Sequence, residues 1–403
     1  MTKGSSVDRD RILIAGGGIG GLAAALALAQ KGVASRVLEK AAQLGEIGAG
    51  IQLGPNAFHC FDRLGVGEAA RAMAVYIDKL RLMDAVADGE ITHVDLGEKF
   101  RARFGNPYGV VHRGDLHGVL LKACRDHPLI ELQTSAEVVG YDQDGGGVTA
   151  RLGPGPTRRG TTVKGSALIG ADGLWSAVRR QVAGDGALRV SGHTTYRSVI
   201  PLAQMPEDLR WNAATLWAGP KCHVVHYPLS GWKVFNLVVT YHNHAPEPVA
   251  GRPVPVEEVR KGFTHICERA QNIIRHGKDW HMWVLCDRDP IDAWIDGRVA
   301  LLGDAAHPML QYMAQGACMA MEDAVCLADS LSRHDSLEAG LAGYRDRRVL
   351  RTARVQLMSR AMGDHVYHPD GPHAALRNAL MNAKSQDQWL DTLQWLYGGN
   401  GLD

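Results

Sequence analysis

Short apolar runs separated by glycine-rich turns dominate the first forty residues. An apolar run at 12–15 is followed at once by glycines, and an alanine- and leucine-rich stretch then extends to Gly32. A second short stretch, Ser-Arg-Val-Leu, covers 35–38 and ends in two apolar residues. Short stretches with buried-type residues bounded by turns predict strands, and the longer alanine-rich stretch predicts a helix. The pattern therefore indicates a strand–helix–strand unit with a parallel sheet.

The glycines of this unit have the G-x-G-x-x-G spacing, at Gly16, Gly18 and Gly21. In that spacing the first glycine permits a tight turn, the second lets the backbone approach a pyrophosphate, and the third lets the helix pack against the strand. Glu39 stands at the tip of the second predicted strand, where a carboxylate can accept hydrogen bonds from ribose hydroxyls. We expect a dinucleotide here. An ordinary turn with a surface glutamate is the alternative, and this motif does not distinguish NAD from FAD.

Two later stretches rich in apolar residues, 166–169 and 299–302, are each followed by a glycine and, within the next two residues, an aspartate. The aspartates are Asp172 and Asp304. Both follow a predicted parallel strand at its carboxyl end, which is where open α/β sheets bind ligands. Either aspartate could instead only cap the helix that follows it.

The middle of the chain, 183–280, is richer in β-strand patterns, with a hairpin predicted around Ser230-Gly231. Alternation along 222–228 places His223 and Tyr227 on one face of a strand, about 13–14 Å apart at their Cα atoms at ~3.4 Å per residue. An aromatic acid lying between them could contact both side chains. The simpler alternative is that both only hydrogen-bond neighbouring backbone.

Composition narrows the class of protein. The 403 residues are 45% hydrophobic and 22% charged, as in ordinary globular proteins, and 44 basic residues balance 43 acidic ones. A nucleic-acid binder would show a basic surplus. The seven cysteines are scattered without a Cys-x-x-Cys, and His307 has no partner at metal-ligand spacing, so we expect no disulfide framework, no metal site and a reducing compartment. No apolar run is long enough to span a membrane, and we expect a cytoplasmic protein.

The three motifs, in this order, resemble those of the class A flavoprotein aromatic hydroxylases, which are FAD-dependent monooxygenases. The resemblance implies an α/β fold: a glutathione-reductase-type, Rossmann-like FAD domain, a β-sheet-based substrate domain and C-terminal helices. The corresponding segments are 1–182 and 281–335 for the FAD domain, 183–280 for the substrate domain and 336–403 for the helices.

The resemblance also implies a role for each motif. The first motif, with Glu39, would hold the ADP part of FAD, Asp172 would contact both FAD and the reduced nicotinamide, and Asp304 would hold the ribityl chain. A helix expected to begin near 315–317 would aim its free N–H groups at the flavin. The cofactor-binding residues predicted in this way are Gly16, Gly18, Gly21, Glu39, Arg113, Asp172, Gly303, Asp304, Gly316 and Ala317.

The loop 308–312, Pro-Met-Leu-Gln-Tyr, lacks the histidine of the P-H-Q-G type of loop found in salicylate hydroxylases. It resembles instead the members that hydroxylate 3-hydroxybenzoate, which implies that His223, Tyr227 and Gln311 line the substrate pocket, with His223 as the base or only an orienting group. The expected reaction converts 3-hydroxybenzoate, NADH and O2 to gentisate through a flavin C4a-hydroperoxide, in an enzyme that is often a homodimer.

Several alternatives stay open at this point. Within the family, the substrate could be salicylate or 6-hydroxynicotinate, and NADPH is not excluded as the reductant. From another class, a non-flavin NAD-binding dehydrogenase or a nucleotide sensor would need only the first motif.

Overall fold

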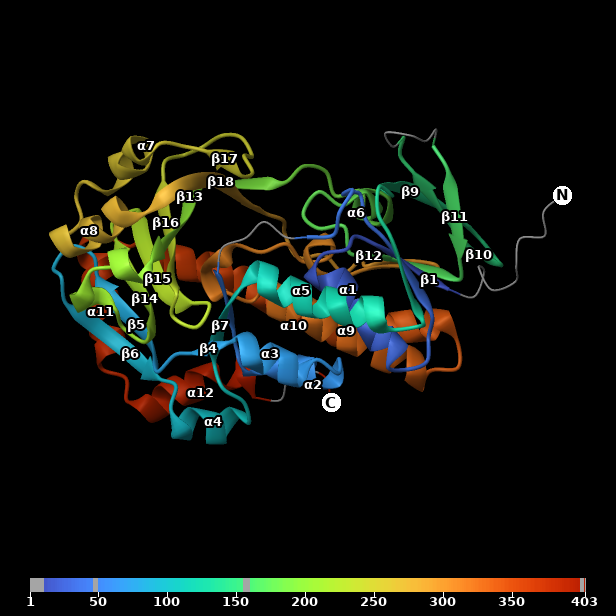
Figure 1. Cartoon of the computed structure of the whole chain (residues 1–403), viewed down its shortest axis with the longest axis horizontal. Coiled ribbons are helices and arrows are strands. Elements are labelled where there is room, and N and C mark those ends of the chain that lie inside the picture. The colour runs from blue at the N-terminus through green and yellow to red at the C-terminus, as the bar shows by residue number, and fades with distance from the viewer. Residues whose placement is uncertain (1–10, 46–49, 155–159, 399–401, 403) are drawn as a thin grey trace.

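The molecule has two large sheets, one in each half of the structure (Figure 1). The computed structural model describes residues 11–45, 50–154, 160–398 and 402. A six-stranded sheet carries the glycine-rich turn, and an eight-stranded sheet forms the opposite end of the molecule. The long helix α10 (Leu337–Met362) extends along the molecule between these two regions.

The six-stranded sheet confirms the predicted parallel unit. The predicted strands 12–15 and 35–38 have exactly those bounds, and the runs at 166–169 and 299–302 differ from the observed strands by one residue. All neighbours pair in parallel except the antiparallel edge strand β19. In spatial order the strands are β19 (Ile295–Asp296), β20 (Val299–Leu301), β12 (Ala167–Gly170), β1 (Ile12–Ala15), β2 (Ser35–Leu38) and β8 (Ile130–Gln133).

Helix α1 (Ile19–Ala29) follows the glycine turn and packs against α5 (Arg113–Asp126) and α9 (Gly316–Arg333). Ten of its eleven residues are buried. A helix that is apolar on all sides belongs in the interior of a protein, which explains its run of alanine and leucine. This packing fixes the amino end of α1 above the carboxyl ends of β1 and β12.

The eight-stranded sheet is antiparallel apart from the β14–β5 pair. This sheet extends beyond the predicted substrate segment, 183–280. Two of its strands, β5 and β6, come from before residue 182, and β18 continues past residue 280. The division into four domain segments stays a prediction. In spatial order the strands are β17 (Arg252–Pro253), β18 (Lys278–Asp287), β13 (Arg189–Pro201), β16 (Val234–His242), β15 (Cys222–Leu229), β14 (Ala213–Gly219), β5 (Lys79–Asp84) and β6 (Glu90–Asp95).

The hairpin predicted around Ser230-Gly231 joins β15 to β16. The pattern over 256–276 also favours a helix, but the structure has two helices there, α7 (Val256–Arg260) and α8 (Glu268–His276), with a 3₁₀ turn between them. The break has a physical reason, since the backbone N–H of Cys267 donates to the carbonyl of Ala85 at 2.6 Å and ties the start of α8 to the end of β5.

Two small sheets and the remaining helices complete the fold. The C-terminal helix α11 lies against β6, and α12 lies against α4 and β6. In Figure 1, α12 and α4 are at the lower edge of the molecule. The small sheets are β3 (Gly50–Leu53), β7 (Gly109–His112) and β4 (Val75–Tyr76), and β9 (Val138–Asp144), β10 (Gly147–Leu152) and β11 (Thr162–Gly165). The other helices are α2 (Pro55–Arg63), α3 (Gly67–Met73), α4 (Glu98–Phe104), α6 (Ala177–Val182), α11 (Gly371–Asn382) and α12 (Gln386–Tyr397).

Candidate active site

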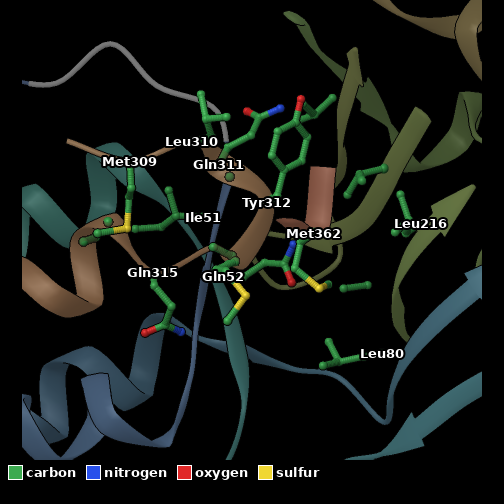
Figure 2. Close-up of a pocket in the computed structure, with 18 of the residues that line it drawn as sticks. Ile51, Gln52, Leu80, Leu216, Met309, Leu310, Gln311, Tyr312, Gln315 and Met362 are labelled. Atoms are coloured by element: carbon green, nitrogen blue, oxygen red, sulfur yellow. The ribbon is translucent and has the colours of Figure 1, made fainter. Parts of the chain in front are cut away.

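One cavity of about 530 Å³ lies where the two halves meet, and residues of both halves line it. At one end its wall is the glycine turn at 18–20, and at the other end it is the face of β15 with His223 and Tyr227. The segment 309–317 forms the wall between these ends. Figure 2 shows part of this segment, with β3 on one side and Leu80 and Leu216 of the large sheet on the other. A cavity of this size, with mostly apolar walls and a few polar groups, is typical of a small-molecule site.

The glycine turn meets the geometric demands of a nucleotide-binding loop. Gly16 has φ +102°, and a Cβ there would lie 2.4 Å from the carbonyl oxygen of Ala171. A Cβ at Gly21 would lie 2.0 Å from the carbonyl oxygen of Gly16. Gly18 caps the amino end of α1, so the free N–H groups of that helix open at the wall of the cavity. The turn thus requires glycine at two of the three motif positions, Gly16 and Gly21.

Glu39 follows β2, as predicted, and braces this turn. Its carboxylate accepts hydrogen bonds from the backbone N–H groups of Gly17, at 2.7 Å, and Ala41, at 2.8 Å. A carboxylate has about four acceptor positions, so both oxygens keep room for ribose hydroxyls. His117 of α5 contacts the carbonyl oxygen of Gly17 at 2.8 Å through Nε2, and sequence reasoning missed it. The sequence feature that could have indicated His117 is its position one helical turn after Arg113.

Asp172 caps the next helix, the alternative that its sequence left open. Its carboxylate accepts from the Ser176 hydroxyl, at 2.5 Å, and the backbone N–H of Ala177, at 2.7 Å. Burial raises the pKa of Asp172 although these hydrogen bonds oppose the shift. Its neighbours Ala171 and Gly173 line the cavity. A contact of Asp172 with FAD and nicotinamide stays a prediction.

Asp304 is the acid that faces the cavity. It is exposed, it lines the cavity, and among the residues that the structure describes its carboxylate has no hydrogen-bonding or ionic partner. The backbone N–H of Gly303, which has φ +62°, donates to Asp323 at 3.0 Å and fixes the turn from the other side. An aspartate held at a cavity wall with both oxygens available suits the hydroxyls of a ribityl chain.

Helix α9 begins at Gly316, with Gln315 as its N-cap residue, within the range predicted from the sequence. Gln315, Gly316 and Ala317 all line the cavity, so the positive end of this 18-residue helix opens there. Arg113 lines the cavity as well and is the first residue of α5, directly after β7. Together with the glycine turn and Asp304, these groups fit FAD: phosphate donors, a hydroxyl acceptor and donors for an electron-rich ring edge.

The far wall carries the predicted substrate residues. His223 is 1% exposed, and its Nδ1 lies 2.7 Å from Nε2 of His368. Its own Nε2 has no partner within the described part of the chain. Burial lowers the pKa of His223 well below its usual value, and His368 and His193 add to the shift. The imidazole is therefore neutral near pH 7 and can accept a proton at Nε2.

Tyr227 lies four residues after His223 on the same face of β15 and also lines the cavity. Burial raises the pKa of its phenol, so it is a neutral donor at physiological pH. No hydrogen-bond partner of its hydroxyl occurs in the described ranges of the chain. A polar group in an apolar cavity needs such a partner, which a bound ligand can provide.

Gln311 lines the cavity, but the sheet holds its amide. Its Nε2 donates to the hydroxyls of Thr195 and Thr240, at 3.1 Å each, and its Oε1 accepts from Nη2 of Arg197 at 3.3 Å. The resemblance placed Gln311 in the substrate pocket, and a direct contact of its amide with the aromatic acid stays a prediction. Figure 2 shows its side chain beside the ring of Tyr312, at the side of the large sheet.

Sequence reasoning missed an aromatic cluster behind His223. The Tyr312 hydroxyl lies 2.5 Å from Nδ1 of His193, and the Tyr367 ring lies 4.9 Å from the rings of both His223 and Tyr312. Tyr367 and His368 come from the turn after α10, which nothing in the local sequence connects to β15. Only the fold brings them together.

The part of the chain that the structure describes holds no cluster of side chains suited to a metal ion. Nε2 of His307 lies 2.5 Å from the carboxylate of Asp323. Within the described residues no group of three histidine, cysteine, aspartate or glutamate side chains could hold a metal ion. In the same residues, no helix combines the length and the apolar character that crossing a membrane requires.

A nucleotide cradle and an apolar pocket with a neutral imidazole, joined in one cavity, define a dinucleotide-dependent enzyme of the two-domain flavoprotein type. The chain belongs to the FAD-binding domain family, whose model matches residues 9–358. It is a flavin-dependent aromatic hydroxylase, a monooxygenase, and its cofactor is FAD.

Three relatives support this assignment. The chain is 56% identical to 3-hydroxybenzoate 6-hydroxylase 1 of Aquipseudomonas alcaligenes, over 96% of this chain and 98% of that protein. It is 49% identical to 3-hydroxybenzoate 6-hydroxylase of Polaromonas naphthalenivorans, over 96% of each. Among solved structures, Klebsiella pneumoniae HpxO complexed with FAD and uric acid is 25% identical, with a TM-score of 0.83, over 98% of this chain and all of that one.

Proposed function

We propose that this enzyme hydroxylates 3-hydroxybenzoate at the ring carbon para to the hydroxyl group and releases 2,5-dihydroxybenzoate (gentisate). One O2 and one NADH with a proton are consumed, and NAD⁺ and water are formed. The names of the relatives that are 56% and 49% identical over nearly the whole chain support this substrate. FAD, when bound, accepts the hydride of the nicotinamide and activates O2, chemistry that side chains do not supply.

The observation that carries the proposal is the position of His223 in the cavity. Its Nε2 has no described protein partner, and its Nδ1 is held by His368 at 2.7 Å. The ring carbon para to a phenol becomes most electron-rich when the phenol loses its proton. A neutral imidazole at the cavity wall can take that proton. Tyr227 then orients the substrate as a hydrogen-bond donor, and Gln311 keeps the loop 309–313 in place against the sheet.

The apolar walls support the same chemistry. Leu80, Leu216, Val225 and Val238 of the large sheet line the pocket, with Met309 and Met313 on the opposite segment. Such walls exclude water, which strengthens the electrostatic interactions of the few polar groups inside. A flat aromatic ring is the ligand shape that such a pocket suits.

The experiment is a product assay with the purified yellow holoenzyme. Consumption of NADH that depends on 3-hydroxybenzoate, with gentisate identified by chromatography, is the expected result. The same assay with salicylate, 6-hydroxynicotinate and NADPH tests the alternatives. Faster and better coupled turnover of salicylate or 6-hydroxynicotinate would overturn the substrate assignment.

We further propose a homodimer in the cytoplasm. All seven cysteines are free, as in a reducing compartment. Leu350 is 80% exposed, and Leu376 and Leu380 of α11 are 58% and 60% exposed, which suits burial against a second copy. Light scattering during gel filtration measures the mass, and a monomer at micromolar concentration would refute the dimer.

A further inference from the structure

Arg197 is a charged residue in the cavity wall. It lies on β13, and its side chain lines the cavity together with His223 and Tyr227. Its backbone position pairs with Val238 of β16, which pairs in turn with Val225 of β15. Arg197 therefore occupies the row of the sheet between the rows of His223 and Tyr227, two strands away. At about 4.8 Å per strand, its long side chain can reach a ligand that lies over Val225 and Val238.

The guanidinium of Arg197 has no acidic partner within the described residues. Its Nε is buried and makes no hydrogen bond there, and its Nη2 donates only to the neutral Oε1 of Gln311. The ring of Trp283 lies 5.4 Å from its central carbon. Arg197 as a whole is half-buried, and a cation that is partly withdrawn from water without a counter-charge is costly unless an anion completes the site.

The surroundings hold the guanidinium in place. Two threonine hydroxyls fix the amide of Gln311, so that its Oε1 faces Nη2 of Arg197. Burial lowers the pKa of Arg197, Tyr227 opposes the shift, and Arg113 adds to it as a second positive charge near the cavity. A preformed guanidinium can bind both oxygens of a carboxylate in one plane.

We propose that Arg197 binds the carboxylate of the aromatic acid and so selects benzoates over neutral phenols. This inference rests on the proposed function, because it takes an aromatic acid as the substrate. With the carboxylate at Arg197, the phenolic hydroxyl can reach Nε2 of His223 across the strand pair β15–β16. One anchor at each polar group then fixes the ring in a single orientation, which is what a regioselective hydroxylation requires.

The test compares an acid with its uncharged amide. Dissociation constants of 3-hydroxybenzoate and 3-hydroxybenzamide are measured by the change in flavin absorbance, in the wild-type holoenzyme and in the variants Arg197→Gln and Arg197→Lys. We expect Arg197→Gln to weaken binding of the acid by about 10- to 100-fold and binding of the amide by less than about threefold. Arg197→Lys keeps the positive charge but loses the planar pair of N–H donors. Its dissociation constant for the acid should therefore lie between those of wild type and Arg197→Gln.

The matched control is Arg125→Gln, an exposed arginine of α5 that does not line the cavity, which should change neither constant. Equal losses for acid and amide in Arg197→Gln, or no loss for the acid, would overturn the proposal. Flavin absorbance of each variant shows whether it has folded, and Arg197→Lys serves if Arg197→Gln does not fold.

The substrate assignment and the role of Arg197 are tested by different measurements. Absence of gentisate from the wild-type enzyme contradicts the substrate, whereas the ratio of the two binding constants concerns Arg197 alone. If another aromatic acid proves to be the substrate, that acid and its own amide replace the pair, and the same ratio decides.

Discussion

Nδ1 of His223 and Nε2 of His368 lie 2.7 Å apart, and both imidazoles are buried. Two neutral rings at this distance share one hydrogen, so the tautomer of one ring sets the tautomer of the other. If His368 accepts at Nε2, then His223 carries its hydrogen on Nδ1 and keeps its lone pair at Nε2. If His368 donates instead, Nε2 of His223 carries the hydrogen. Only the first arrangement lets His223 accept a proton from the substrate.

Replacement of His223 by Ala should lower the turnover number by about 10²–10⁴-fold, the usual contribution of a positioned base. FAD should remain bound, because His223 lies on the large sheet, away from the glycine turn. Steady-state NADH oxidation and gentisate formation across a pH series measure the effect. Turnover that stays at the wild-type level at every pH would remove His223 from the mechanism.

Replacement of His368 by Phe should lower turnover by about 10–100-fold, since His223 loses the partner that sets its tautomer. Because the change acts through His223, the pH profile of turnover should change in the variant. His365→Phe is the matched control, an exposed histidine of the same turn, and it should behave like wild type. A loss that is equal at all pH values would indicate only a packing role for His368.

The cofactor half of the site could be predicted from the sequence because its chemistry is local. A glycine that needs φ +102°, or an acid directly after a strand, is set by its immediate neighbours along the chain. The strands β1 and β2 and the start of α9 were predicted for the same reason. Where local signals had two meanings, as at Asp172, the sequence could not choose between them.

The substrate half could be predicted only in part, because it depends on contacts between distant segments. Alternation placed His223 and Tyr227 on one face, but His368 follows them by more than a hundred residues. Arg197 drew no attention in the sequence, since an arginine in a strand is usually solvated. Its lack of an acidic partner is visible only once β13 is paired with β16.

Replacement of Asp304 by Ala should weaken the retention of FAD, since its carboxylate faces the cavity and has no described protein partner to lose. The ratio of visible flavin absorbance to protein absorbance after gel filtration measures occupancy. Asp335→Ala, at an exposed position outside the cavity, is the control. Full occupancy of Asp304→Ala would refute the assigned contact.

The stability of the protein should fall in acid, in part because of His226. Burial lowers its pKa to about 3, and Arg81 adds to the shift. The unfolded chain binds a proton at His226 as the pH falls below about 6.5, whereas the folded chain does not until about pH 3. The free energy of unfolding therefore decreases between these values, by up to about 1.4 kcal/mol per pH unit for this group.

His226→Gln tests this contribution, because Trp217 donates to His226 at 3.2 Å and the amide oxygen can accept that bond without titrating. Urea unfolding at pH 7 and pH 5 should show a smaller loss of stability in the variant than in wild type. The same loss in both proteins would mean that His226 is not neutral in the folded state.

Arg348 is a buried member of the arginine run of α10. The spacing of these arginines is typical of a solvated or ion-paired face, and Arg348 is ion-paired but 0% exposed, with Glu322 at 2.6 Å and Asp323 at 2.7 Å. Burial raises the pKa of Asp323, but His307 and Arg348 outweigh it and hold that pKa at about 2. Since Asp323 also accepts from the N–H of Gly303, this network supports the turn that carries Asp304.

Replacement of Arg348 by Met should therefore destabilise the protein by up to about 3–5 kcal/mol, because two buried carboxylates lose the cation that they share. Arg351 still pairs with Glu322 and His307 with Asp323 in the variant. Arg345→Met, on the same helix with its side chain 39% exposed, should cost less than about 1 kcal/mol. Urea unfolding at pH 7 measures both. FAD retention should fall in Arg348→Met as well, since the turn at Gly303 loses its support. Similar stabilities of the two variants would contradict the view that the buried network holds the cofactor turn in place.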